Sequence, residues 1–137
     1  MAPLTLPGTL DSLAPIREYI LKAATQAGID KKAAYRLCLA VDEIATNSIV
    51  YGYNRSGLEG PLWIDADIDD KRLKITLEDR GIAFDPRTRP IPDDLDEPLE
   101  KRSTGGLGIY LAVEGVDEFN YERDGDRNRN IFVLNRP

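Results

Sequence analysis

Two stretches in the first half of the chain carry apolar residues at helical spacing. The first begins at Thr9 or Asp11, either of which would cap a helix, and ends near Gly28. The second begins after Asp30, its N-cap, and ends near residues 52–54. The apolar positions are Leu10, Leu13, Ile16, Ile20 and Ala24 in the first stretch and Ala34, Leu37, Cys38, Val41, Ile44 and Ala45 in the second, with Ser48 on the same stripe. This spacing predicts two helices, each with one buried face.

Alternating apolar and polar residues predict short strands before and after the helices. The expected strands cover residues 4–6, 62–68, 72–78, 116–123 and 130–135. Asp69-Asp70 forms the first turn between strands and residues 124–126 the last. Leu73, Ile75 and Leu77 are expected to face the core. Two helices followed by mostly antiparallel strands predict an α+β fold with the helices on one face of the sheet.

The pattern breaks between residues 81 and 104. This segment contains Pro86, Pro90, Pro92 and Pro98 and an acidic run over residues 93–100. A stretch of this length inside a compact domain is usually functional or mobile. Regular structure is predicted to resume at residues 105–108, Gly-Gly-Leu-Gly, which open a short helix that ends near Glu114.

Composition excludes several classes of chemistry. The 137 residues include one cysteine and no histidine, which excludes a Ser-His-Asp or Cys-His pair, a His-ligated metal and an internal disulfide. The net charge of −6 argues against a protein that coats nucleic acid or an anionic membrane. No apolar run is long enough to span a membrane, and the N-terminus lacks a signal-peptide pattern. We expect one domain, residues 1–137, in the cytoplasm.

Three short segments carry candidate chemistry. Glu43 and Asn47 are four residues apart on the second helix and share a face away from its apolar stripe, although such a pair alone is typical of a solvated surface. Asp79 ends a buried strand just before Gly81, which alone is typical of an ordinary turn. Residues 105–108 would expose backbone N–H groups at a helix start, which favours phosphate, although alone they are typical of a hinge or a cap. No Lys-Ser/Thr follows them, so they are not a Walker P-loop.

In this order and spacing, the three segments resemble the motifs of the Bergerat ATP-binding fold, the superfamily of gyrase, heat-shock chaperone ATPases, histidine kinases and mismatch-repair ATPases. Residues 40–53 resemble its N box, residues 79–86 its first glycine box and residues 105–108 its second. The N box and the sequence Phe84-Asp85-Pro86 resemble those of the bacterial anti-sigma-factor serine/threonine kinases. The resemblance covers nearly the whole chain. It implies a two-layer sandwich with a mixed, mostly antiparallel sheet, and an ATP lid over about residues 83–104.

The resemblance also implies a role for each matching residue. Asn47 would ligate Mg²⁺ through its amide oxygen, and Glu43 would be the general base that takes the proton of the attacking hydroxyl. Asp79 would accept a hydrogen bond from the amino group of adenine. Arg102, or Lys101, would contact the terminal phosphate of ATP. The other residues expected to contact ATP are Gly81, Ala83, Thr104, Gly105, Gly106, Leu107, Gly108 and Asn130.

The chain departs from the family pattern at a few positions. Ala83 stands where the first glycine box usually has its second glycine, a change shared by other members with Phe-Asp-Pro. Arg129-Asn130 replaces an expected Gly-Thr, and Tyr51 stands where many relatives have histidine. None of these changes removes the predicted metal ligand or the predicted base.

Two functions follow from the resemblance. The leading hypothesis is a protein serine/threonine kinase that transfers the γ-phosphate of ATP to a small anti-anti-sigma type protein and sequesters a partner such as a sigma factor. The alternative is a nucleotide-gated protein-binding module with negligible kinase activity. The presence of Glu43 favours the kinase, because relatives that only bind can lose the base. The sequence leaves open whether the protein forms a homodimer. Neither nucleic acid nor a membrane is an expected partner.

Overall fold

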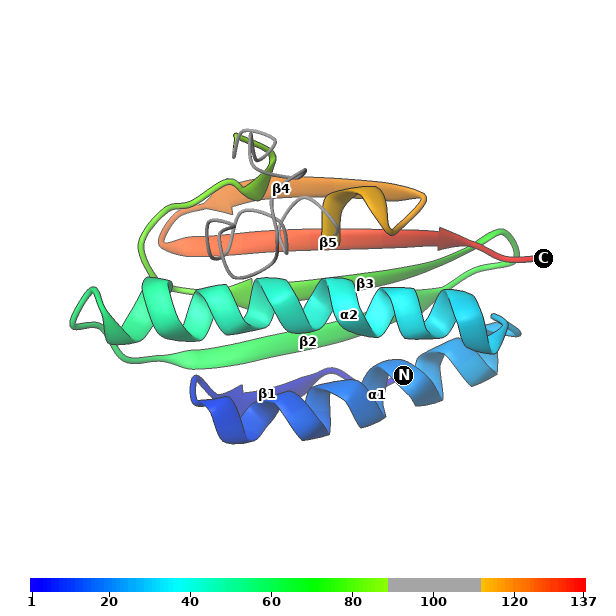
Figure 1. Cartoon of the computed structure of the whole chain (residues 1–137), viewed down its shortest axis with the longest axis horizontal. Coiled ribbons are helices and arrows are strands. Elements are labelled where there is room, and N and C mark those ends of the chain that lie inside the picture. The colour runs from blue at the N-terminus through cyan, green and yellow to red at the C-terminus, as the bar shows by residue number, and fades with distance from the viewer. Residues whose placement is uncertain (89–111) are drawn as a thin grey trace, which may run out of the picture.

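The two predicted helices form one layer of the molecule in the computed structural model, which describes residues 1–88 and 112–137 (Figure 1). Helix α1 covers Leu13–Ala27 and helix α2 covers Lys31–Asn47. Gly28 ends α1 in the left-handed conformation, with φ of 73°, which glycine adopts without steric cost. Asp30 caps α2 as predicted, since its carboxylate accepts a hydrogen bond from the N–H of Ala33 at 2.8 Å.

The start of α1 differs from the prediction. A short 3₁₀ turn, η1 (Leu10–Ser12), precedes the helix, and no side chain caps either element, so neither Thr9 nor Asp11 serves as the cap. The buried Ser12 instead donates its hydroxyl to the carbonyl oxygen of Pro7 at 2.5 Å. This bond ties the start of α1 to the end of the first strand, a contact in space that a local capping pattern does not reveal.

Helix α2 continues into a wider turn, η2 (Ser48–Asn54), in which the backbone is π-helical. The helical segment therefore ends near residues 52–54, as predicted. Short π-helical stretches inside helices often occur at functional sites. The carbonyl oxygen of Gly52 accepts a hydrogen bond from the N–H of Ile82 at 3.3 Å. This turn consequently lies against the chain that leaves the middle of the sheet.

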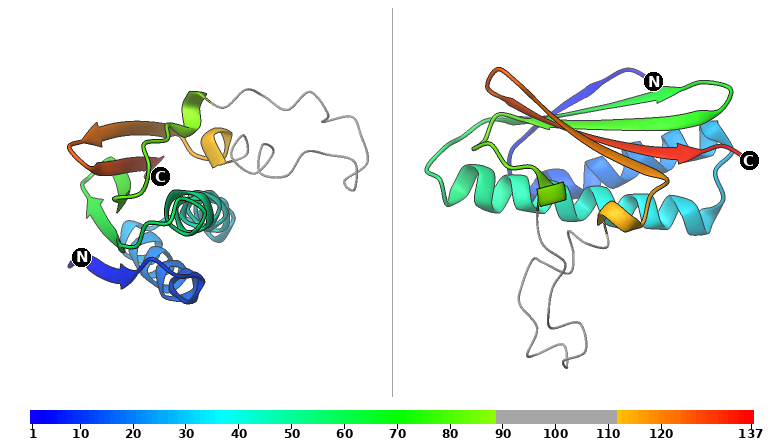
Figure 2. Two further views of the ribbon diagram at one scale, coloured as in Figure 1. Left: turned by 90° about the vertical axis from the view of Figure 1, so that its left-hand side faces the viewer. Right: turned by 90° about the horizontal axis from the view of Figure 1, so that it is seen from above.

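Five antiparallel strands form the second layer, in the order β1-β2-β3-β5-β4. They are β1 (Leu4–Pro7), β2 (Pro61–Ile68), β3 (Arg72–Asp79), β4 (Glu118–Asp124) and β5 (Arg127–Asn135). Seen along the helices in Figure 2, α1 and α2 both lie on one face of the sheet. The predicted α+β sandwich is confirmed, although every pairing between the described strands is antiparallel, so that this sheet is not mixed.

The core lies between the two layers and follows the alternation of the strands. The predicted inward residues Leu73, Ile75 and Leu77 have no exposed surface. They share one apolar cluster with Ile20 of α1 and Val41 of α2, which are also fully buried. Burying one such side chain stabilises the fold by about 1.5–3 kcal/mol. The same periodicity that predicts the helices and strands thus supplies the contacts that hold the layers together.

The last hairpin differs from the prediction at both strand starts. Strand β4 begins at Glu118 rather than at residue 116, and β5 begins at Arg127 rather than at Asn130. The turn shortens to Gly125-Asp126, where Gly125 has φ of 61°. Residues 127–130, Arg-Asn-Arg-Asn, are all polar. The alternation of apolar and polar residues that predicts a strand is therefore missing at the start of β5.

Side-chain contacts on both faces of the sheet hold the first residues of β5 in place. On the face away from the helices, Arg127 and Arg129 pair with Glu78 of β3 at 3.0 and 2.6 Å. The guanidinium of Arg127 also stacks on the ring of Trp63 at 3.9 Å. On the other face, Asn128 stands opposite Asp79 in the strand pairing. Polar contacts therefore extend the strand toward the site described below.

Two segments next to the undescribed residues are short. Residues 86–88 form a 3₁₀ turn, η3 (Pro86–Thr88), and residues 112–114 are helical. The rest of the helix predicted over residues 105–114 lies outside the described residues. Within residues 1–88 and 112–137, no helix has both the length and the apolar character that a membrane crossing requires.

Gly81 packs so closely against η2 that the position has no room for a larger residue. A Cβ atom on Gly81 would lie 2.6 Å from the carbonyl oxygen of Gly52, whereas a Cβ on Gly52 would come no closer than 3.8 Å to its nearest neighbour, the Cα of Gly81. We expect Gly81→Ala to lower the free energy of unfolding by about 1–3 kcal/mol and Gly52→Ala to be nearly neutral. Denaturant unfolding measures both, and equal losses would contradict this contact.

Candidate functional site

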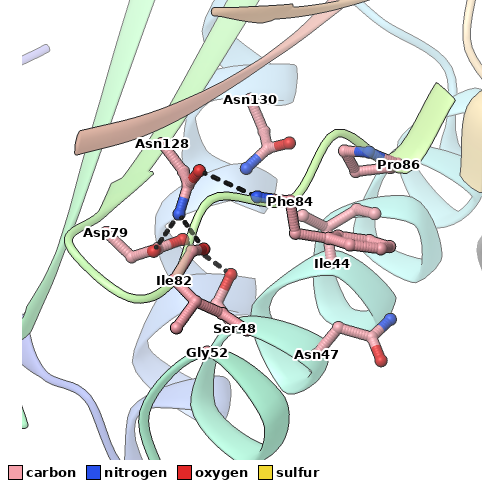
Figure 3. Close-up of a pocket in the computed structure, with 10 residues that line it drawn as sticks. All are labelled: Ile44, Asn47, Ser48, Gly52, Asp79, Ile82, Phe84, Pro86, Asn128 and Asn130. Atoms are coloured by element: carbon pink, nitrogen blue, oxygen red, sulfur yellow. Dashed lines mark hydrogen bonds between the residues drawn. The ribbon is translucent and has the colours of Figure 1, made fainter. Parts of the chain in front are cut away.

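A narrow pocket lies where the end of β3, the start of β5, the end of α2 and the turn η2 meet (Figure 3). Its lining residues are Ile44, Asn47, Ser48, Gly52, Asp79, Ile82, Phe84, Pro86, Asn128 and Asn130. Its volume of about 30 Å³ leaves room for roughly one water molecule. Ile82 and Phe84 are 49% and 37% exposed. Rotation of these two side chains into solvent would widen the pocket for a larger ligand.

Asp79 is the buried acidic group of this pocket, with only 2% of its surface exposed. Its Oδ1 accepts hydrogen bonds from the N–H of Gly81 at 2.8 Å and from Nδ2 of Asn128 at 2.9 Å. Its Oδ2 accepts one from the hydroxyl of Ser48 at 2.8 Å. A carboxylate offers about four lone-pair sites, so a ligand can still donate a hydrogen bond to Oδ2. This acceptor suits a flat ligand with an amino group.

Asn130 contributes a second buried acceptor from β5. Its side-chain oxygen Oδ1 has no hydrogen-bond partner, the only such buried side-chain atom in the described part of the chain. The residue is 2% exposed and lines the same pocket as Asp79. Leaving a buried acceptor unpaired costs about 1–3 kcal/mol, a cost that a donor on a bound ligand would remove. The prediction from the sequence that Asn130 faces a ligand is consistent with this placement.

Asn47 lines the other end of the pocket, and Glu43 lies one turn earlier on α2, next to it. The side-chain nitrogen of Asn47 donates to the backbone oxygen of Glu43 at 3.0 Å and to its Oε1 at 3.4 Å. Because the nitrogen is turned toward Glu43, the amide oxygen is the atom left to face a cation. Burial raises the pKa of Glu43 above its ordinary value of 4.5; the bond from Asn47 lowers it, and the charge of Asp42 raises it. A raised pKa makes this carboxylate a stronger base.

The chemistry of these groups fits a purine nucleotide with Mg²⁺. Buried acceptors at Asp79 and Asn130 match amino groups of a base, and the apolar side chains of Ile44, Ile82 and Phe84 match its faces. Magnesium that binds with a nucleotide takes most of its ligands from phosphates and water, and one or two from the protein. The amide oxygen of Asn47 is suited to be such a ligand.

The structure brings together part of the predicted site. Glu43, Asn47, Asp79 and Asn130 lie at or next to one pocket. Gly81 and Ala83 are not among its lining residues: Gly81 is buried against Gly52, and Ala83 is exposed.

The remaining predicted site residues belong to the undescribed segment. Residues 89–111 lie outside the described part of the chain. They include Arg102, Thr104, Gly105, Gly106, Leu107 and Gly108, and most of the lid expected over residues 83–104. The predicted roles of these residues remain predictions.

Two residues of the pocket that bond to Asp79 through their side chains are not identified by the sequence reasoning. Ser48, the first residue of η2, continues the apolar stripe of α2, but its hydroxyl donates to Asp79, 31 positions away in the sequence. Asn128 lies two residues before Asn130, on the same face of β5, and bonds to Asp79 as well. If the sequence reasoning had begun the last strand at residue 127, it would have placed Asn128 on the same face as Asn130.

The family of the chain follows from comparison with known proteins. The model of the histidine kinase-like ATPase domain family matches residues 6–134. The chain belongs to this family, as its motifs predicted. Among its relatives is the serine-protein kinase RsbW of Listeria monocytogenes, 29% identical over 118 residues that cover 84% of this chain and 74% of the relative. RsbW of Staphylococcus aureus is 27% identical over 126 residues, which cover 89% of this chain and 79% of the relative.

Solved structures show the same fold. The structure of the RsbU and RsbW domains of Rv1364c from Mycobacterium tuberculosis matches the whole chain with a TM-score of 0.65 at 17% identity. The chain spans about a third (34%) of that longer protein. The SiaB–SiaC complex from Pseudomonas aeruginosa contains a chain that matches 98% of this one, over 89% of its own length, with a TM-score of 0.58 at 11% identity. These likenesses confirm the predicted fold, and the relatives confirm the predicted resemblance to bacterial serine-protein kinases.

Proposed function

We propose that this protein is an ATP-dependent serine/threonine kinase of the anti-sigma type. The observation that carries the proposal is one pocket with a buried carboxylate, Asp79, at one end and Asn47, which is bonded to Glu43, at the other. This arrangement suits a nucleotide whose base lies at Asp79 and whose phosphates lie near Asn47. The names of the relatives support the choice of a kinase acting on serine.

Each end of the pocket has a distinct part in the reaction. Asp79 accepts a hydrogen bond from the adenine amino group, and Asn130 offers a second acceptor nearby. Asn47 would hold Mg²⁺, which would supply positive charge beside the phosphates. Glu43 takes the proton of the substrate hydroxyl as that oxygen attacks the γ-phosphorus and the bond to ADP breaks.

The sequence supplies the groups for the phosphate end. We assign Gly105, Gly106 and Gly108, with Thr104 and Leu107, to backbone contacts with the phosphates, and Arg102 to the charge that develops on the transferred group. Residues from 83 to 104 would cover the nucleotide as a lid. These assignments rest on the second glycine box and its position in the chain.

The proposed substrate is a small anti-anti-sigma type protein, and the proposed second partner is a sigma factor or a similar regulator. The names of the RsbW relatives support a protein substrate, and the SiaB–SiaC complex contains a chain of this fold. We place the reaction in the cytoplasm, where ATP and transcription regulators occur. A negative net charge of −6 would favour encounter with a basic surface on a partner.

Binding of Mg·ATP should stabilise the protein, and Asn47 should be needed for the contribution of magnesium. With ligand at about 100 times its dissociation constant, linkage predicts about 2.7 kcal/mol of added stability. A thermal shift assay with ATP, with and without Mg²⁺, should show a larger shift with the ion in the wild type. In Asn47→Ala the two shifts should be equal. A full magnesium effect in that variant would contradict the role of Asn47 as the ligand.

A further inference from the structure

Asn128 connects the buried carboxylate of the pocket to two other segments of the chain, residues 82–84 and β4. Its Nδ2 donates to Oδ1 of Asp79 at 2.9 Å and to the carbonyl oxygen of Ile82 at 2.9 Å. Its Oδ1 accepts from the N–H of Phe84 at 3.3 Å and from the hydroxyl of Tyr121 on β4. Figure 3 shows the amide between Asp79 on one side and Phe84 on the other.

These bonds require an amide, because one end of the group donates and the other accepts. A carboxylate at this position would set an oxygen against Oδ1 of Asp79 and the carbonyl of Ile82, where both partners are acceptors. An apolar side chain would leave several buried groups unpaired, since Asn128 is only 4% exposed. Asparagine therefore meets a specific requirement of this part of the pocket.

The bond to Asp79 fixes the plane of its carboxylate. Oδ1 is held by two donors, Asn128 and the N–H of Gly81, whereas Oδ2 is held by the hydroxyl of Ser48 alone. The atom with spare acceptor capacity is thus Oδ2, and its direction depends on the donors to Oδ1. The bonds to Ile82 and Phe84 fix the backbone of the segment whose side chains border the pocket, while those side chains can still rotate.

We propose that Asn128 is a positioning residue for base recognition. It aims Oδ2 of Asp79 at the amino group of adenine and fixes the backbone of residues 82–84, whose side chains border the base. The inference rests on the proposed function of Asp79, but it concerns selectivity among nucleotides, not whether a nucleotide binds. The hydrogen bond from the hydroxyl of Tyr121 means that β4 also helps to hold the amide of Asn128 in place.

The test is the ratio of dissociation constants for GTP and ATP, measured by calorimetry on the wild type, Asn128→Asp and Asn128→Ala. We expect both variants to bind ATP at least about tenfold more weakly, which corresponds to about 1.4 kcal/mol, and to bind GTP nearly as well as ATP. The control is Ile75→Val, a core variant on β3 that loses one buried methylene group and should lower stability without touching the pocket. Its GTP-to-ATP ratio should equal that of the wild type, because a merely structural loss does not change selectivity.

A second measurement uses the wild type alone and does not depend on the folding of a variant. The side-chain amide protons of Asn128 should be protected from exchange, and their NMR signals should shift more with ATP than with GTP. If the wild type binds ATP, either of two results would overturn the inference. One is an unchanged ratio of the GTP and ATP dissociation constants in a folded Asn128 variant, and the other is side-chain amide protons that exchange freely and do not shift with ATP. Failure of the wild type to bind ATP would instead overturn the proposed function.

Discussion

Glu43→Gln should lower the rate of phosphoryl transfer by roughly 10²–10⁴-fold while ATP still binds. Glutamine has nearly the shape of glutamate, and its side-chain oxygen can accept the bond that Asn47 now donates to Oε1. It cannot take a proton from a substrate hydroxyl. Single-turnover transfer from labelled ATP measures the chemical step, and calorimetry measures the affinity for ATP.

The neighbouring carboxylate provides a matched control. Asp42 pairs with Arg17 at 3.3 Å on the surface of the helix layer, so Asp42→Asn should leave the transfer rate nearly unchanged. Transfer by the wild type should also fall as the pH is lowered through the pKa of Glu43, which burial raises above 4.5, because the protonated carboxyl is no base. Equal rates in the wild type and Glu43→Gln would favour the alternative of a nucleotide-gated binding module.

Asp79→Asn should weaken ATP binding by roughly 10- to 100-fold and remove most of the preference for ATP over GTP. The charged acceptor for the adenine amino group is lost, and hydrogen bonds to charged groups contribute about 1.5–3 kcal/mol. In the place of Oδ1, the new amide nitrogen would face two donors, Gly81 and Asn128. In the place of Oδ2, it could donate to the hydroxyl of Ser48 but would offer adenine no acceptor. Thermal shifts with the two nucleotides, at several concentrations, measure the change.

Glu78 is the control for this variant, since it precedes Asp79 and points to the opposite face of the sheet. It pairs there with Arg127 and Arg129 and lies away from the pocket. Glu78→Gln should therefore keep the wild-type preference for ATP. A wild-type protein whose thermal shift with GTP equals that with ATP would show that Asp79 does not read the base.

The elements of the fold could be predicted because their apolar periodicity is the same property that builds the core. The helical stripes around Ile20 and Val41 and the alternation of Leu73, Ile75 and Leu77 became the buried faces of the two layers. The start of β5 could not be predicted in this way. It depends on the pairing of Arg127 and Arg129 with Glu78, which are partners far apart in the sequence.

The site was predicted where it matched a motif and missed where it depends on contacts across the fold. Glu43, Asn47 and Asp79 stand in recognisable sequence motifs, and the structure places Asn47 and Asp79 in one pocket with Glu43 bonded to Asn47. Ser48 and Asn128 act through hydrogen bonds to Asp79 from 31 and 49 positions away. The tight approach of Gly81 to Gly52 likewise arises from the π-helical turn, which no local pattern in the sequence indicates.

The proposal of a kinase is tested most directly by transfer of phosphate from γ-labelled ATP. The purified protein is incubated with Mg²⁺, labelled ATP and the candidate anti-anti-sigma type proteins encoded in the same operon, with Glu43→Gln as a parallel reaction. We expect label on a serine or threonine of one of these proteins, dependent on Mg²⁺ and on Glu43. A wild-type protein that binds Mg·ATP but labels none of them, even when a complex forms, would contradict the kinase and identify a nucleotide-gated binding module.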